Sequence, residues 1–373
     1  MTIRPTTQMF KLFRVAAEDQ RLWHVNFDQN TKNPFFEFVG NRNAISRLAC
    51  FAFHALGNDK HHVAQNIAFI GPASVGKTKM AHAFAKIMSL PFVEIEPTSV
   101  NSPADILVKI AEVLEKIEVS TGTNGVADGN KTTLELIPDG NRIKLPAMIL
   151  FIDEVQNMKR SAIDGLLKAT EPNDRTLDTG KLIVDCSLVC WMIATTDRGD
   201  LPAPFDSRFI KIELDVFSQQ EVAEIIYLNN KDWAMADCLQ VARFGGRIAR
   251  EALLFATEVR AQIPMGDGTV AYAIESARKL NGIDEFGLSK KRLQILMALA
   301  DGPIAKARIA GIITCGMAEV ENFIMPSLLA TTADQKAFVA MGPRGYCLTN
   351  EGYNELAKRG IKYTRLSNVN WKN

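Results

Sequence analysis

The most constraining feature of this sequence is a glycine-rich segment, residues 71–78, with the letters GPASVGKT. It follows a short apolar run at 66–70 and precedes residues 78–88, where apolar side chains recur at helical spacing. The pattern of a glycine, four residues and then Gly-Lys-Thr, placed between a strand and a helix, predicts a phosphate-binding loop. Because strand-like and helix-like segments alternate over residues 35–215, the chain is expected to have an α/β fold.

Each residue type in this loop has a chemical reason to meet a triphosphate. Glycine lets backbone amides approach phosphate oxygens without a Cβ clash, and the helix N-terminus adds a positive dipole. Lysine supplies a charge to the β- and γ-phosphates, and threonine offers a hydroxyl to Mg²⁺. The predicted nucleotide-binding residues are Gly71, Pro72, Ala73, Ser74, Val75, Gly76, Lys77 and Thr78.

A second motif, Asp153-Glu154, ends the nearly continuous apolar run at 147–152. Such a run is expected of a buried parallel strand, and parallel strands present their functional ends at their carboxyl termini. We expect Asp153 to hold Mg²⁺, together with Thr78, and Glu154 to act as the general base for an attacking water. The alternative is that the two acids only cap a helix.

Three further residues are candidates for sensing the nucleotide. Thr196 follows the apolar strand at 188–194, and its hydroxyl is expected near the γ-phosphate; the alternative is a simple turn cap. Arg208 follows a proline-rich turn and could complete a neighbouring subunit's site, where an arginine can accelerate hydrolysis about 10³–10⁵-fold; the alternative is a surface arginine. Arg247 follows Gly245-Gly246 at the start of a helix and is expected to contact the γ-phosphate within its own subunit.

The pattern of apolar residues changes along the chain and divides it into four parts. Residues 1–34 form an N-terminal arm, and residues 35–215 alternate strands with helices. Residues 216–283 are predicted to be helical throughout. Residues 284–373 suggest three helices and a β-hairpin around Gly342-Pro-Arg-Gly345, which is the pattern of a winged helix.

Taken together and in this order, these motifs resemble those of the AAA+ ATPases, and among them the RuvB family of Holliday-junction motors. The resemblance covers roughly residues 35–358 and includes 38–41, 194–196, 281–288 and 342–346. It implies a P-loop parallel-sheet ATPase domain, a helical lid domain and a winged helix. It also implies that ATP and Mg²⁺ are bound, that Phe38 and Val39 line the adenine pocket, and that the wing residue Arg344 contacts the DNA backbone.

The implied partners are DNA, bound through its backbone with low sequence specificity, and further copies of the chain in a hexameric ring. The segment between Glu171 and Ser187 is shorter than the hairpin with which the family docks on its partner RuvA, so we expect a protein adaptor other than RuvA. Residues 103–142 are longer than the family pattern, and the wing has Tyr346 where the family tends to have a second arginine.

Charge and composition narrow the function further. The net charge is +1, and residues 284–373 carry 12 basic and 8 acidic residues, so this part is the basic one. A basic terminal domain is what phosphate binding requires. The six cysteines include no CxxC pair, which gives no indication of a disulfide framework or a zinc ribbon. We expect a cytoplasmic protein, bacterial or phage-encoded, without a signal peptide or membrane span.

Three function classes follow from these features. The first is an ATP-hydrolysing ring motor acting on DNA, in RuvB-like branch migration or duplex translocation during recombination or repair. The second is an ATP-switched DNA-binding assembly factor, such as a transposition regulator or helicase loader, without motor activity. The third is a ring that threads polypeptide; it would need an aromatic pore loop, and residues 100–119 suggest none.

Overall fold

The computed structural model of the 373-residue chain describes residues 38–57, 65–88, 90–121, 135–137, 142–180, 182–196, 199, 201–246, 248–332 and 335–361. The chain divides into two compact units, residues 1–214 and 215–373. Each unit has its own buried hydrophobic clusters. Within the described residues, no helix has the length and apolar character that crossing a membrane requires.

The first unit is built on a five-stranded sheet in which every neighbouring pair is parallel. The strand order is β2-β5-β8-β1-β9. The strands are β1 (Ile67–Ile70), β2 (Phe92–Ile95), β5 (Met148–Ile152), β8 (Val189–Thr195) and β9 (Ile210–Glu213). The apolar runs that the sequence analysis described at 66–70, 147–152 and 188–194 form β1, β5 and β8, and β2 and β9 complete the sheet. Because β8 lies between β1 and β5, its end faces both the glycine-rich loop and the acidic pair.

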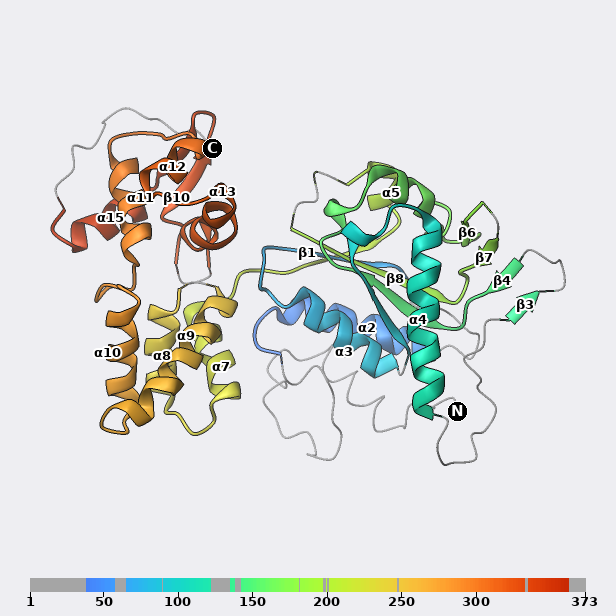
Figure 1. Ribbon diagram of the computed structural model, residues 1–373, viewed down its shortest axis with the longest axis horizontal. Coiled ribbons are helices and arrows are strands. Elements are labelled where there is room, and N and C mark those ends of the chain that lie inside the picture. The colour runs from blue at the N-terminus through green and yellow to red at the C-terminus, as the bar shows by residue number, and fades with distance from the viewer. Residues whose placement is uncertain are drawn as a thin grey trace. The chain divides into compact units, whose positions relative to one another are not determined.

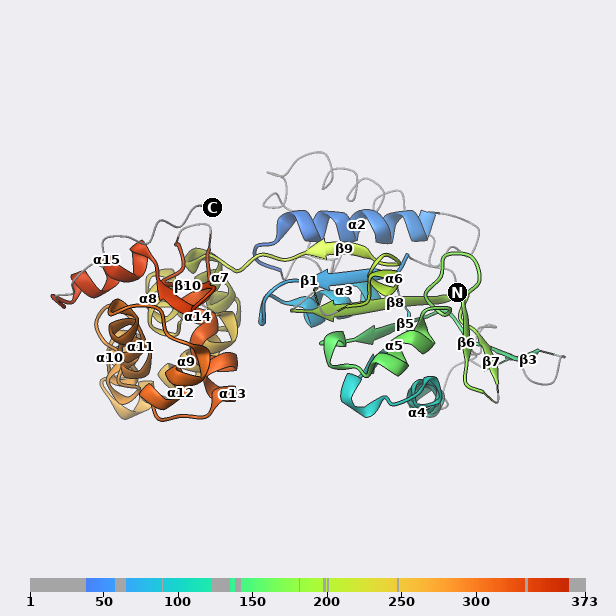
Figure 2. The same ribbon diagram turned by 90° about the horizontal axis from the view of Figure 1, so that it is seen from above.

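Helices cover both faces of this sheet, as Figures 1 and 2 show. On one face lie α2 (Arg42–Gly57) and α3 (Lys77–Met88), and on the other lie α4 (Pro103–Thr121) and α5 (Arg160–Leu166). The short helices are η3 (Pro97–Ser99), η4 (Val155–Asn157) and α6 (Ala203–Asp206). Side chains of the central strands alternate between the two faces, and all of those in β5 and β8 are buried. A strand buried on both faces must be apolar along its whole length, which explains the uninterrupted runs in the sequence.

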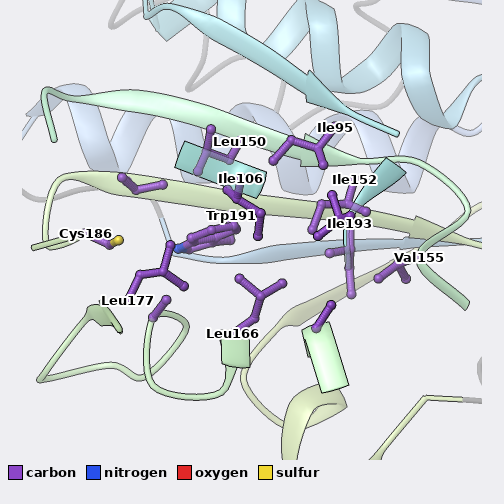
Figure 3. Close-up of a cluster of buried hydrophobic side chains, with 14 of the residues drawn as sticks. Ile95, Ile106, Leu150, Ile152, Val155, Leu166, Leu177, Cys186, Trp191 and Ile193 are labelled. Carbon is purple, nitrogen blue, oxygen red and sulfur yellow. The ribbon is translucent and has the colours of Figure 1, made fainter. Parts of the chain in front are cut away.

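One of the two cores of this unit is shown in Figure 3. Trp191 of β8 lies at its centre and is 1% exposed. Leu166 of α5, Ile106 of α4 and Leu177 pack around it, and each is fully buried. This packing fixes α5 against the sheet beside the strand ends that carry the functional residues.

A second, four-stranded sheet belongs to the same unit and has the order β3-β4-β7-β6. Its strands are β3 (Glu135–Ile137), β4 (Arg142–Lys144), β6 (Thr176–Asp178) and β7 (Ile183–Asp185). Two antiparallel hairpins, β3–β4 and β6–β7, are joined by a parallel pairing of β4 with β7. The segment that the sequence suggested to be a shortened hairpin is therefore a hairpin of three-residue strands, extended by part of the long 103–142 segment.

The second unit begins with four helices packed around one core. These are α7 (Gln219–Asn229), α8 (Met235–Phe244), α9 (Ala249–Gln262) and α10 (Val270–Leu280), with the turn η6 (Ile263–Met265) after α9. The prediction that residues 216–283 are helical is thus confirmed. Ser218 opens α7 with a capping box, in which its side chain accepts from the Glu221 amide while the Glu221 side chain accepts from the Ser218 amide.

The remainder of the second unit combines helices with a β-hairpin around another core. Its elements are α11 (Lys290–Ala300), α12 (Lys306–Ile312), α13 (Met317–Glu319), the π-helical turn η7 (Val320–Ile324), α14 (Met325–Leu329), β10 (Val339–Gly342), β11 (Gly345–Leu348) and α15 (Asn350–Lys358). Strands β10 and β11 pair antiparallel, with Gly342 opposite Gly345. The predicted hairpin and helices are thus present, with α15 as an addition.

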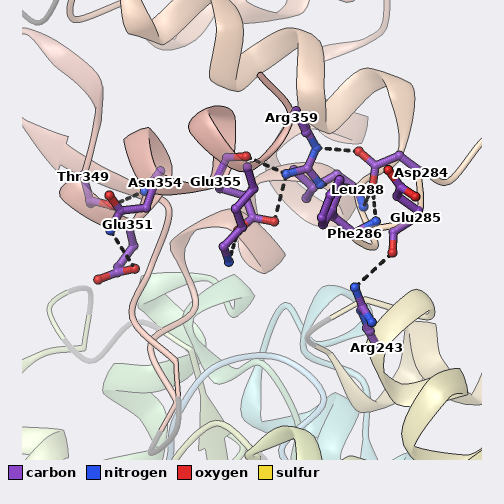
Figure 4. Close-up of polar contacts among 12 residues, drawn as sticks. Arg243, Asp284, Glu285, Phe286, Leu288, Thr349, Glu351, Asn354, Glu355 and Arg359 are labelled. Atoms are coloured by element: carbon purple, nitrogen blue, oxygen red, sulfur yellow. Dashed lines mark hydrogen bonds and ion pairs between the residues drawn. The ribbon is translucent and has the colours of Figure 1, made fainter. Parts of the chain in front are cut away.

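Polar contacts connect the start of this second half to its last helix (Figure 4). The Arg359 guanidinium donates to both Asp284 oxygens, at 2.6 and 3.0 Å, and to the Glu355 carboxylate at 2.9 Å. The amides of Phe286 and Leu288 also donate to Asp284, each at 2.9 Å. Asp284 lies within the 281–288 segment of the family resemblance. Its contacts hold the turn at residues 284–288 against the C-terminal end of α15.

Candidate active site

The glycine-rich loop joins β1 to α3, as the sequence predicts. A Cβ atom on Gly71 would lie 2.5 Å from the carbonyl oxygen of Leu214, so no side chain fits there without displacement. Gly76 has φ of +92°, which favours glycine, and the space around its missing Cβ is open. Val75 is buried, at 2% exposure, and anchors the loop in the core. The loop is therefore packed against the core at Gly71 and Val75 and is open at Gly76. A phosphate-binding loop requires this shape.

Lys77 is the first residue of α3, and its side chain is only 5% exposed. The ammonium donates to the carbonyl oxygens of Gly71 at 2.8 Å and Pro72 at 3.0 Å. It lies 3.9 Å from Oε1 of Glu154. A lysine held against the loop's own backbone is positioned to bind an anion that enters the loop.

Thr78 and Asp153 meet although they lie 75 positions apart in the sequence. The Thr78 hydroxyl donates to Oδ2 of Asp153 at 2.6 Å, and the Glu154 amide donates to Oδ1 at 3.0 Å. Hydroxyl and carboxylate oxygens are hard ligands of the kind that Mg²⁺ prefers. The two residues that the sequence assigned to the metal are thus adjacent, in an arrangement that fits this ion.

Glu154 lies at the end of β5, in the left-handed region with φ of +48° and ψ of +50°. Its side chain makes no capping hydrogen bond to η4, the short helix that follows, so the alternative of a simple cap is not supported. Oε2 of Glu154 accepts from the Thr196 hydroxyl at 3.2 Å. The structure therefore brings the predicted base and the predicted γ-phosphate sensor together.

Gln156 belongs to the same cluster, and the sequence analysis missed it. Its side-chain nitrogen donates to Oε2 of Glu154 at 2.5 Å and to the Thr196 hydroxyl at 3.0 Å. Its side-chain oxygen accepts from the Thr195 hydroxyl at 2.7 Å. The only signal in the sequence was a polar residue two positions after the acidic pair, which is common in any turn.

Arg208 is neither an exposed surface residue nor directed at its own subunit's glycine-rich loop. Its side chain is 20% exposed and forms an ion pair with Glu171 at 2.9 Å. It also donates to the carbonyl oxygen of Leu167. Arg208 thus lies beside the segment that follows α5, held by a carboxylate that the sequence analysis did not single out.

Phe38 and Val39 lie before α2, close to the helix that carries the lysine of the loop. The Lys79 ammonium is 5.3 Å from the centre of the Phe38 ring, and Phe38 packs against the core cluster of α2 and α3. Gly40 and Asn41 both have positive φ, which turns the chain sharply into α2. This places the predicted adenine-binding segment on the same side of the sheet as α3.

Arg247 lies outside the described residues, but the turn before it is described. A Cβ atom on Gly246, whose φ is +88°, would lie 2.5 Å from Oε2 of Glu251. Arg292 of α11 donates to that same oxygen at 2.5 Å. Burial raises the pKa of the Glu251 carboxyl, and the facing Arg292 offsets only part of that effect.

Arg344 lies in the second unit, at the turn between β10 and β11, and is exposed. Tyr346, which replaces the second arginine expected from the resemblance, is 4% exposed and packs into the core. Arg344 is therefore the basic residue that this hairpin presents at its tip.

Comparisons with known proteins agree with this geometry. Residues 67–216 match the family model AAA, described as the ATPase family associated with various cellular activities. Residues 1–103 match the model of the parvovirus non-structural protein NS1. No curated protein matches the sequence.

Among solved structures, the chain is similar to RuvB of Thermotoga maritima, described as a Holliday junction branch migration motor. That structure matches with a TM-score of 0.62 and 22% identity, over 86% of this chain and 95% of the other. Two substituted forms of the same protein match with a TM-score of 0.64, at 21% and 23% identity. The α/β fold of this chain is therefore the AAA+ fold, and the predicted resemblance to RuvB is confirmed at the level of the fold.

Proposed function

We propose that this chain, whose AAA+ fold resembles that of RuvB, is an ATP-hydrolysing ring motor that acts on DNA, in RuvB-like branch migration or duplex translocation. One observation supports hydrolysis above all. Four residues from two distant motifs, Lys77, Thr78, Asp153 and Glu154, meet within hydrogen-bond or ion-pair distance at the carboxyl ends of β1 and β5. This is the set of charges and hydroxyls that a Mg²⁺-bound triphosphate needs.

The residues of this edge divide the binding of ATP among them. Backbone amides of the loop and the N-terminus of α3 face the phosphates, and Lys77 neutralises part of their charge. Thr78 and Asp153 would hold Mg²⁺ together with phosphate oxygens. Among the described residues, no group of three or more His, Cys, Asp or Glu side chains could hold a metal ion. When bound, the ion draws electron density from the phosphates.

Hydrolysis then requires a water molecule opposite the leaving ADP. The water oxygen forms a bond to the γ-phosphorus while the bond from that phosphorus to the bridging oxygen breaks. Glu154 accepts the proton that the water loses, and ADP leaves with the electron pair of the broken bond. Thr196, whose hydroxyl donates to Glu154, would hold the water or a γ-phosphate oxygen.

Two arginines are proposed to complete the ATPase site. Arg208 would leave Glu171 and reach the ATP of a neighbouring subunit in the ring, where it neutralises charge in the transition state. Arg247 would report the nucleotide state from within the same subunit. In this scheme residues 35–215 form the ATPase domain and residues 216–283 the lid, with Arg247 on the lid moving as ATP is bound and released.

DNA binding is assigned to residues 284–373 as a winged helix, with Arg344 on the wing contacting the backbone. Support comes from the net charge of this part and from the exposure of Arg344 at the tip of the β10–β11 hairpin. The acids of the helix that would enter a groove are paired with lysines, Glu319 with Lys291 and Glu321 with Lys306. Such a surface suits backbone contacts better than the reading of base edges.

The second candidate is an ATP-switched DNA-binding assembly factor without motor activity, such as a transposition regulator or helicase loader. The four-stranded second sheet favours it, because β4 pairs with β7 and embeds the short β6–β7 hairpin in a larger surface. Such a surface suits an adaptor different from RuvA. The match of residues 1–103 to a parvovirus non-structural protein also fits a role in replication. Under either candidate function, the protein would act in the cytoplasm of a bacterium and would be encoded by the bacterium or by a phage.

The deciding experiment combines ATPase and branch-migration assays on the full chain with the Glu154→Gln variant. A DNA-stimulated ATPase that moves a branched junction supports the motor, and ATP-dependent rings or filaments without movement support the assembly factor. Glu154→Gln should retain ATP but lower its hydrolysis by about 10²–10⁴-fold, because the base is lost while the binding groups remain. Hydrolysis at the unsubstituted rate would contradict the assignment of Glu154.

A further inference from the structure

Gln156 occupies an unusual position between the acidic pair and the end of β8. It lies within η4, Val155–Asn157, which follows directly on the left-handed backbone of Glu154. This turn sends the chain back, so that the side chains at positions 154 and 156 lie side by side. A left-handed conformation at a residue other than glycine is costly and persists where the surroundings hold it in place.

The chemistry of the neighbours fixes the orientation of the Gln156 amide. A carboxylate only accepts hydrogen bonds, so the amide nitrogen must face Oε2 of Glu154, where it lies 2.5 Å away. The amide oxygen then faces the Thr195 hydroxyl, which donates to it at 2.7 Å. A single side chain therefore uses its donor end on the base and its acceptor end on a fully buried residue of the sheet.

Thr195 connects this amide to the phosphate loop. It lies opposite Ile70 in the pairing of β8 with β1, and its carbonyl oxygen accepts from the Gly71 amide at 3.3 Å. Gln156 thus forms a hydrogen bond with Thr195, and the backbone of Thr195 is held by β1, the strand that leads into the phosphate loop. The distance from the loop to the Glu154 carboxylate is consequently fixed through the sheet rather than through the long segment between the two motifs.

We propose that Gln156 is a positioning residue for Glu154, a role that rests on the proposed hydrolysis of ATP. Its amide and the Thr196 hydroxyl occupy Oε2, which leaves Oε1, the oxygen 3.9 Å from the Lys77 ammonium, directed at the phosphate loop. Oε1 is then the oxygen that accepts the proton of the attacking water. Because the same amide contacts Thr196, movement of that threonine toward a γ-phosphate is transmitted to the base.

The test compares Gln156→Leu with the unsubstituted chain in steady-state ATP hydrolysis and in binding of a non-hydrolysable ATP analogue. Gln156→Leu should lower kcat by about 10–10²-fold while the analogue's Kd changes less than about twofold, because the base loses its orientation and the binding groups remain. Gln156→His should restore much of kcat, because neutral imidazole has one donor and one acceptor.

Gln65→Leu is the matched control, since Gln65 is exposed in the same unit just before β1, and it should leave every readout unchanged. An unchanged kcat in Gln156→Leu, in a chain that hydrolyses ATP, would overturn the positioning role alone. Equal loss of kcat and analogue binding would show a structural role and overturn it as well. No turnover in the unsubstituted chain would overturn the proposed function, and the role of Gln156 with it.

Discussion

Two clusters of charged side chains in this molecule differ in how their charges are matched. In the second unit, Arg359 is 7% exposed and closes onto Asp284 and Glu355 at 2.6–3.0 Å. In the first unit, the Lys77 ammonium lies 3.9 Å from Glu154 and donates to neutral carbonyl oxygens of its own loop. The Arg359 cluster satisfies its charges internally, whereas the Lys77 and Glu154 charges are directed to the edge of the sheet.

The pKa directions in the second unit agree with this difference. Burial alone would raise the pKa of Asp284, but hydrogen bonds from Arg359 and from the Leu288 and Phe286 amides outweigh it and lower that pKa. Burial likewise opposes the charge of Arg359, yet its carboxylate partners raise its pKa. Removing one partner from a cluster of this kind is strongly destabilising, because an uncompensated charge is left in a partly buried place. The open cluster at the phosphate loop is instead suited to a ligand that brings negative charge.

The largest effect is expected from the substitution Lys77→Ala in the first unit. Hydrolysis should fall by about 10³-fold or more, with weakened ATP binding, because a preorganised charge at the phosphates is lost. Lys86→Ala, on the exposed side of the same helix, is the control and should hydrolyse ATP normally. Phosphate release and nucleotide binding measure both. If Lys77→Ala keeps full activity, the loop is not the nucleotide site.

A smaller effect, and on stability instead of activity, is expected from Arg359→Met. Two carboxylates would be left without their partner in a largely buried place, which should destabilise the second unit by about 3 kcal/mol. Lys358→Met is the control, because Lys358 is mostly exposed and forms only one local pair with Glu355. Calorimetry of the full chain measures the change. Equal melting of the two variants would show that the Arg359 cluster contributes nothing.

The smallest expected effect is the dependence of the second unit on acid. Since the folded-state pKa of Asp284 is lowered, its contribution is complete above its unfolded value near 4 and is lost as the pH falls through the folded value. Urea unfolding from pH 7 to pH 3 should show this loss, and Arg359→Met should reduce its slope. An identical slope in both proteins would assign the acid sensitivity to other carboxylates.

The candidate site residues that the sequence predicted share one property: each belongs to a motif that is local in the chain. Lys77 and Thr78 follow the glycines directly, and Asp153 and Glu154 end a buried strand. Their chemistry depends on spacing and on the strand that precedes them, so the sequence predicts both the residues and their roles.

The features that the sequence analysis missed depend on partners from elsewhere in the chain. Strand β9 has four residues, of which Ile212 is buried while Lys211 and Glu213 are polar, and it becomes a strand only by pairing with β1. The parallel pairing of β4 with β7, which joins the two hairpins of the second sheet, likewise leaves no pattern in strands of three residues. Nothing in the sequence indicates that Glu171 pairs with Arg208, because the two residues lie 37 positions apart.

The sequence by itself determined the phosphate loop, the acidic strand end, the helical segments of the second unit and its hairpin, because backbone geometry and periodic burial of apolar residues act over short stretches. Only the tertiary structure decided the strand order, which puts β8 between the two motifs, and with it the contacts of Gln156. Hydrogen bonds between side chains depend on distances of a few tenths of an ångström. Such distances are fixed only when the sheet and both of its helical layers have packed.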